Sequence, residues 1–154
     1  MTILRKTIAI LLLSLCAGAH AGTADDHFLL TPALVQKTKA AYAALEKANL
    51  PEQSEAEEKE DDKYRKNGEL PVERFILSIE KRPGAKSIVA KHGLSPKEFG
   101  LATYALIDAS MVLVHEKMAG KAEAAKMQAK LTREQQENVA LVRKLGPAAA
   151  LSGQ

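Results

Sequence analysis

The sequence is poor in the side chains that build disulfides and nucleic-acid stacking surfaces. Its 154 residues include one cysteine, no tryptophan, three phenylalanines and three tyrosines, and the formal net charge is only +3. Because aromatic residues are few and the excess of basic over acidic side chains is small, nucleic acid is not the expected partner. The lone Cys16 has no second cysteine with which to form an internal disulfide. No apolar run reaches the roughly 20 residues that a membrane-spanning helix needs, so we expect no membrane span.

The first 21 residues have the three parts of a secretory signal peptide. Arg5 and Lys6 precede a short apolar run at 8–15, and small residues follow that run. Cleavage after Ala19 or after Ala21 would satisfy the A-x-A pattern. We expect cleavage after Ala21, and a protein that is periplasmic or secreted.

Removal of residues 1–21 changes the composition of the chain that remains. Cys16 is lost together with two of the 22 basic side chains, while all 19 acidic side chains stay, so the net charge falls from +3 to +1. A chain without cysteine has no thiolate nucleophile and no cysteine-based metal or haem site. The near-zero charge again argues against nucleic acid.

The pattern of apolar residues after the leader predicts an all-α protein. We expect an arm at 22–30, then a single domain at 31–154 that forms a small bundle of four to six helices with short turns. Ser95 and Thr132 each precede a Glu or Gln by three residues, as in a helix capping box. The C-terminal residues 147–154 are expected to form a frayed tail. The longest expected helix spans about 96–118 and lies centrally. Its expected core face comprises Phe99, Leu106, Ile107, Leu113 and Val114.

An acidic connector interrupts the helical pattern at 52–69. Its first part, 52–62, carries seven acidic residues, one lysine and no large apolar residue. Such a segment cannot bury a face of its own, so we expect either a solvated helix or a mobile linker. Binding of divalent cations or of a basic partner is the functional alternative, but the segment lacks the D-x-D-x-D-G calcium loop.

The expected central helix carries the few candidate site residues. Met111, His115 and Met118 share one helical edge, and two thioethers with an imidazole suit Cu(I). The alternative is that the methionines fill the core. Asp108 is either a buried carboxylate with a raised pKa or the place where the helix meets water, and we favour the latter. His92 stands at a helix C-terminus, where a cation is favourable.

No catalytic motif is present. The chain has no GxSxG, SxxK, P-loop or GxGxxG sequence, and Ala119 stands where a zinc-binding HExxH motif starting at His115 would need its second histidine. We therefore expect no enzyme, no catalytic residue, no resident metal and no cofactor. The leading hypothesis is a non-catalytic exported helical protein that binds a protein or a small ligand in the periplasm. Its partner is unknown, and another periplasmic protein is one candidate.

Two stretches resemble an uncharacterised family of small exported helical proteins from bacteria. They are AKHGLSPKEF at 90–99 and QENVALVRKL at 136–145, which match that family's Gly-Leu-Ser/Thr-Pro-x-Glu and Asn-Val-Ala segments. The resemblance covers about 70–146. It implies a helical fold and export, but no activity.

The sequence LTREQ at 131–135 resembles the LTxxQ motif of the Spy/CpxP family of periplasmic chaperones and stress accessory proteins. That family normally carries the motif twice. Here the second candidate is 94–98, with Ser and Glu in place of Thr and Gln. The resemblance implies an all-helical fold and makes a Spy/CpxP-like chaperone the alternative function. Copper binding through Met111, His115 and Met118 is the third candidate function.

Overall fold

The computed structural model describes residues 27–66, 68–149 and 151, and within them it confirms the all-α fold. The predicted signal peptide at 1–21 and residues 22–26 of the predicted arm lie outside this range. The described part contains no β-strand, only an isolated bridge between Lys66 and Glu69. The helices are α2 (Pro32–Lys47), α3 (Glu55–Asp62), α4 (Val72–Lys81), α5 (Pro83–Lys91), α6 (Pro96–Met118), α7 (Lys121–Gln128), α8 (Arg133–Leu145) and the 3₁₀ turn η1 (Gly146–Ala149).

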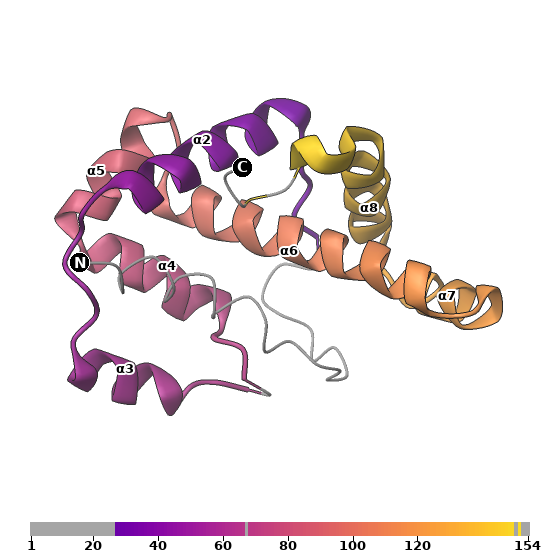
Figure 1. The fold of residues 1–154 in the computed structure, drawn as a ribbon, viewed down its shortest axis with the longest axis horizontal. Helices are drawn as coiled ribbons and strands as arrows, with labels where there is room; N and C mark the ends of the chain where they lie inside the picture. Colours follow the sequence, from indigo (N-terminus) through magenta and orange to yellow (C-terminus); the bar gives the residue numbers. More distant parts are fainter. Residues whose placement is uncertain (1–26, 67, 150, 152–154) are drawn as a thin grey trace, which may run out of the picture.

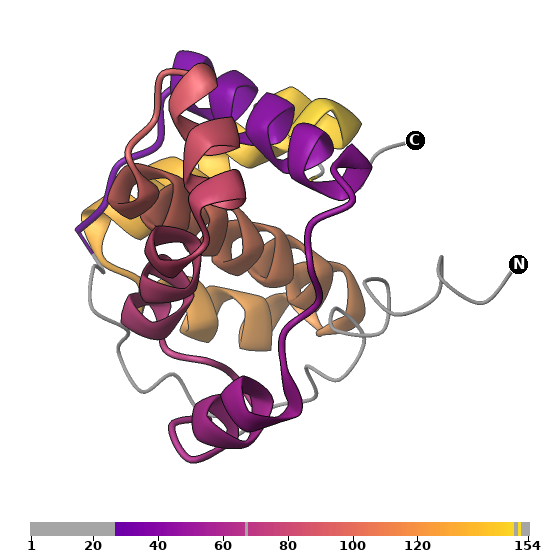
Figure 2. The ribbon, with the colours of Figure 1, turned by 90° about the vertical axis from the view of Figure 1, so that its left-hand side faces the viewer.

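The long helix α6 is the centre of the bundle, as expected (Figure 1). Its first half packs against α4 on one side and against α2 and α5 on the other, while α8 packs on its second half. α7 folds back beside the end of α6. The acidic helix α3 lies outermost, beyond α4, in both views (Figures 1 and 2). The acidic segment therefore contains a helix that is exposed except at Asp61. With α3 the described part has seven α-helices, one more than the upper end of the expected four to six.

The interior consists of two apolar clusters that share α2 and α6. The first lies between α2, α6, α8 and η1, and its buried members are Leu30, Val35, Ala102, Leu106, Ala109, Val112, Val139, Val142 and Ala149. The second lies between α2, α4, α5 and the start of α6, and its buried members are Ala41, Ile79, Ala85, Val89, Leu94 and Phe99. Because α6 contributes to both clusters, it holds the two halves of the bundle together.

The expected core face of α6 is partly wrong. Val114 is 47% exposed, whereas Ala102, Ala109 and Val112 are buried. Ala102 and Ala109 lie on the side of α6 opposite to that of Met111, and their small side chains let neighbouring helices approach that side closely. The packing of α2 and α8 determines which side of α6 is buried. Both helices pack on the alanine side, so the large residues on the other side near the C-terminal end of α6 stay exposed or half-buried.

Helix α4 covers only the first half of the other side of α6. The ring of Phe75 lies 6.0 Å from that of Phe99 and 5.7 Å from that of Tyr104, measured between centroids. The Tyr104 hydroxyl donates a hydrogen bond to the carbonyl oxygen of Leu70, just before α4. Burial raises the pKa of Tyr104, so the phenol stays protonated and remains a donor.

The two ends of the described chain are fastened to the bundle. The backbone N–H of Leu30 donates to Oδ1 of Asn138 at 2.8 Å, and Nδ2 of Asn138 donates to the carbonyl oxygen of Phe28 at 2.7 Å. At the other end, η1 follows α8, and Ala149 is only 2% exposed. The prediction of a tail frayed from residue 147 is therefore wrong up to Ala149, because its methyl group completes the first apolar cluster.

The predicted capping boxes are present, and one of them yields a pH test. The Ser95 hydroxyl accepts from the N–H of Glu98 at 3.1 Å, and the Glu98 carboxylate accepts from the N–H of Ser95 at 2.9 Å. The backbone hydrogen bond from Ser95 holds the pKa of Glu98 below its usual value of 4.5. This carboxylate therefore stabilises the fold at neutral pH, and that contribution is lost as the pH falls from about 4.5 through the lower folded-state pKa.

We expect Glu98→Gln to reduce the loss of stability between pH 5 and pH 3. Gln keeps the capping geometry but does not titrate. The substitution therefore removes one of the described carboxylates whose pKa is lowered, which are Glu57, Glu98, Glu116 and Glu134. The measurement is urea unfolding across that pH window. A slope identical to that of the parent chain would contradict the assignment.

One buried polar group has no partner in the described part of the chain. The hydroxyl of Thr38 in α2 is fully buried and makes no hydrogen bond there. Removing an unsatisfied buried hydroxyl while keeping its shape is favourable, so Thr38→Val should stabilise the protein by about 1 kcal/mol. Thr103→Val is the matched control, because the buried Thr103 hydroxyl donates to the carbonyl oxygen of Phe99 at 2.7 Å. Loss of that hydrogen bond should destabilise the protein. Urea unfolding of both variants decides; equal effects would contradict this account.

Candidate functional site

The three residues proposed for Cu(I) lie on the outward side of α6. Met118 is 81% exposed, and Met111 and His115 are half-buried. The imidazole of His115 has no hydrogen-bond partner among the described residues. The alternative that the methionines fill the core therefore does not hold for Met118. In the described part of the chain, no cluster of three or more His, Cys, Asp and Glu side chains is placed to hold a metal ion.

The two other candidate residues, Asp108 and His92, lie at a helix edge and at a helix end. Asp108 is exposed at the edge of α6, where the helix meets water, as predicted. His92 is the half-buried C-cap of α5. Neither of them, nor His115, lines the pocket described next, so the predicted polar residues do not converge on one site.

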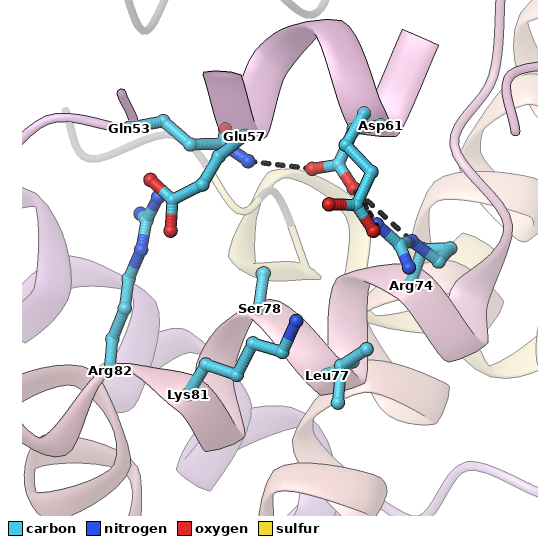
Figure 3. A pocket seen from close by; sticks show the side chains of 9 residues that line it. Gln53, Glu57, Asp61, Arg74, Leu77, Ser78, Lys81 and Arg82 are labelled. Atoms are coloured by element: carbon cyan, nitrogen blue, oxygen red, sulfur yellow. Dashed lines mark hydrogen bonds and ion pairs between the residues drawn. The ribbon is translucent and has the colours of Figure 1, made fainter. Parts of the chain in front are cut away.

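The described part of the molecule has a small polar pocket between α3 and α4 (Figure 3). Acidic side chains from α3 face basic side chains from α4 across it, and its volume is about 30 Å³. Its lining residues are Gln53, Glu57, Glu60, Asp61, Arg74, Leu77, Ser78, Lys81 and Arg82. This space suits a few waters rather than an organic substrate, whose pockets measure roughly 300 Å³ or more.

A buried ion pair forms one wall of this pocket. Asp61 is 6% exposed, and its Oδ1 accepts from Nη2 of Arg74 at 2.8 Å and from Nε at 3.2 Å. Nε2 of Gln53 donates to Oδ2 at 2.6 Å. The Arg74 guanidinium also contacts Glu60 and lies 4.2 Å from the ring centroid of Tyr64. The hydrogen bonds to Asp61 raise the pKa of Arg74.

Two further polar groups of the pocket, Glu57 and Ser78, are also engaged within the fold. Glu57 caps α3 through Ser54, and the backbone hydrogen bond from Ser54 lowers its pKa, with Arg82 and Lys81 acting in the same direction. Glu57 is therefore ionised at neutral pH and does not serve as a proton donor. The hydroxyl of Ser78 donates to the carbonyl oxygen of Phe75 at 2.7 Å, so its proton is already held within α4. The pocket is best explained as the polar attachment of α3 to α4.

Sequence reasoning missed this attachment. It treated 52–62 as uniformly solvated, because α3 contains no large apolar residue. Only the position of Arg74 on the side of α4 that faces α3 selects Asp61, among seven acids, for burial. The isolated sequence contains no signal for that choice.

The attachment predicts that α3 opens when Arg74 is changed. We expect Arg74→Gln to speed amide hydrogen exchange in α3 at least tenfold, because most of the polar contacts that hold α3 depend on that guanidinium. Exchange in α6 should stay as in the parent chain. Arg143→Gln, which removes the ion pair with Glu116 at the far end of α6, is the control and should leave α3 unchanged. Unaltered exchange in α3 of the Arg74 variant would contradict the attachment.

The second candidate surface is the uncovered side of α6 beyond α4. We call it the α6 outer face, and it comprises Ile107, Met111, Val114 and Met118. Ile107 and Met111 are half-buried, Val114 is 47% exposed and Met118 is 81% exposed. The large apolar side chains exposed in the described part of the chain are Leu29, Tyr64, Val114 and Met118. Two of these four therefore lie on consecutive turns of one helix.

A polar network joins the end of α6 to α7 and α8. Oε2 of Glu116, on another side of α6, accepts from Nη2 of Arg143 of α8 at 2.7 Å, and Oε1 accepts from Nε2 of Gln128 of α7. The bond from Arg143 lowers the pKa of Glu116. These contacts fasten the end of α6 to both following helices and leave its outer face open.

Comparisons with protein-family models, with curated proteins and with solved structures gave no match to this chain. Among the described residues, no helix is both long enough and apolar enough to cross a membrane. Because the pocket between α3 and α4 is a structural attachment, the α6 outer face is the better candidate for a functional surface in the described part of the chain.

Proposed function

We propose that the protein is an exported, non-catalytic helical binding protein that contacts its partner through the α6 outer face. The observation that carries the proposal is the exposure of Val114 and Met118 on consecutive turns of the central helix. Exposed apolar side chains that adjoin one another on a rigid element are typical of protein interaction sites. The partner is a helix that presents a matching apolar stripe, because the face is convex and one helix wide.

Export is the second part of the proposal, and the leader sequence supports it. Arg5 and Lys6, the apolar run at 8–15 and the alanines before residue 22 have the pattern of a cleaved signal. The test expresses the full chain in a bacterial cell and determines the mass of the protein in the periplasm. A chain that begins at Gly22 is expected. An uncleaved chain in the cytoplasm would contradict export.

Site-specific photo-cross-linking tests the binding face. A photoreactive phenylalanine replaces Val114 in one chain and Lys86, an exposed residue of α5, in a control chain. Irradiation of cells should give a discrete adduct from position 114 and none from position 86. Adducts of equal yield from both positions, or none from position 114, would contradict the proposal.

Cu(I) binding is a second candidate, which the accessibility of Met118 and the unpartnered imidazole of His115 favour within the described part of the chain. Thioether and imidazole ligands suit Cu(I), and an exported protein can meet that ion. Titration with Cu(I) under reducing conditions should then show binding that is lost when Met111→Leu is combined with His115→Ala. No binding, or binding that the two changes leave intact, would end this candidate.

A Spy/CpxP-like chaperone remains the alternative that the LTREQ segment suggests. In this chain Thr132 caps α8 and Oε1 of Gln135 accepts from the N–H of Thr132 at 2.9 Å, so both residues have a role in starting a helix. The alternative predicts that the protein suppresses aggregation of an unfolded client at stoichiometric ratio without ATP. Unchanged client aggregation would dismiss it.

A further inference from the structure

We infer that the partner of the α6 outer face is the same face of a second copy of this chain. This inference rests on the proposed binding role of that face and adds the identity of its partner. It follows from the spacing of the apolar residues, from the charges beside them and from the extent to which α4 covers α6.

The apolar residues of the face repeat as the seam of a coiled coil. Ile107, Met111, Val114 and Met118 are separated by four, three and four residues, so they occupy successive d, a, d and a positions of a heptad. Such a seam pairs with another of the same spacing through knobs-into-holes packing. The preceding a position, Tyr104, lies under α4, which ends the seam at Ile107.

The charged residues beside the seam select an antiparallel pair. Asp108 and His115 occupy the two e positions, on one edge of the face. In an antiparallel pair related by a two-fold axis, the e edge of one helix lies along the e edge of the other. Asp108 of each copy then faces His115 of the other, and two acid–imidazole contacts form. A parallel pair would instead set Asp108 against Thr103 and His115 against Ser110, the g positions five residues earlier, and would form neither contact.

The coverage of α6 is compatible with that arrangement. When Met111 of one copy lies beside Val114 of the other, Ile107 lies beside Met118 and Tyr104 falls beyond the end of the partner's seam. Helix α4, which packs over Tyr104, then lies outside the paired region. His115 offers an imidazole without a partner among the described residues. Asp108 also acts within its own chain, where its charge is a minor contribution to the raised pKa of Tyr104.

The length of the seam sets the strength of the association. Residues 107–118 extend over about 18 Å of helix, which is short for a stable dimer. We therefore expect a weak dimer that forms as the concentration rises from about 10 µM to about 500 µM. Sedimentation velocity of the full chain over that range is the first test. A monomer at every concentration would overturn the inference.

Substitutions in the seam test its location. Val114→Asp should weaken dimerisation at least tenfold, because it places a carboxylate in the apolar seam of both copies. Ala40→Asp, at an exposed position of α2, is the matched control and should leave dimerisation unchanged. Equal dimerisation of the two variants would overturn the inference.

A charge exchange tests the orientation. Asp108→Lys alone and His115→Glu alone should each weaken the dimer, since each places like or unmatched charges across the two-fold axis. The chain with both changes should recover parental dimerisation, because the introduced lysine of each copy then faces the introduced glutamate of the other. Failure of the double variant to recover would overturn the antiparallel arrangement, whatever the single variants show.

The outcome also separates this inference from the proposed function. A chain that stays monomeric, while photo-cross-linking from position 114 gives an adduct with a different protein, overturns the second copy and leaves the binding face intact. A chain that is monomeric and gives no adduct contradicts both.

Discussion

Phe99→Ala is expected to lower the free energy of unfolding by about 3–5 kcal/mol, the largest effect of any single change considered for this protein. Phe99 is fully buried at the start of α6, and its ring lies against that of Phe75 of α4. The same side chain belongs to the cluster formed with α2 and α5. Truncation therefore leaves a cavity where four helices meet, and urea unfolding measures the loss.

The matched comparison lies on the same helix. Val114→Ala removes an apolar group that is 47% exposed, so it should cost less than about 1 kcal/mol. Similar losses from the two substitutions would show that the outer face belongs to the core, which would contradict the architecture described above.

Asn138→Leu is expected to have the second largest effect, with a loss of about 2–3 kcal/mol. Asn138 is 4% exposed, and its side-chain amide bonds both to the N–H of Leu30 and to the carbonyl oxygen of Phe28. Leucine has a similar volume but leaves both backbone groups without these bonds. The arm should detach from α8, so hydrogen exchange at the Leu30 amide should rise along with the loss of stability.

Glu137→Leu is the control for that substitution. Glu137 is exposed one position earlier on α8, where it pairs with Arg133. Loss of an exposed pair changes stability by less than about 1 kcal/mol. An Asn138 variant as stable as the Glu137 variant would contradict the role of the amide as the anchor of the arm.

Local sequence rules predicted where most helices begin and end. Thr31, Ser95 and Thr132 cap helices because their hydroxyls satisfy free N–H groups of the first turn, an interaction that depends only on residues three positions apart. The long helix expected at 96–118 is α6, with the same bounds. These features could be predicted because the interacting groups are close in the sequence.

Features that depend on packing between distant segments could not be predicted in this way. Val114 lies on the apolar side of α6 by periodicity, yet it is exposed because α2 and α8 pack on the alanines instead. Asn138 anchors a segment more than 100 residues away, and neither partner marks the other in the sequence. Asp61 is buried only because Arg74 lies opposite to it.

The candidate surfaces show the same division. The shared edge of Met111, His115 and Met118 was evident from helical spacing alone. That this edge faces outward depends on how far α4 extends along α6, which the sequence does not specify. The binding face is therefore a property of the assembled bundle.

The yield of the photo-cross-linked adduct from position 118, compared between the parent chain and its Val114→Asp variant, tests the central claim most directly. The two positions lie one turn apart on the α6 outer face, and Met118 is the more exposed. The account predicts at least a tenfold loss of adduct in the Val114→Asp chain, with thermal unfolding close to that of the parent. An adduct of undiminished yield from a folded Val114→Asp chain would show that the protein does not bind through this face.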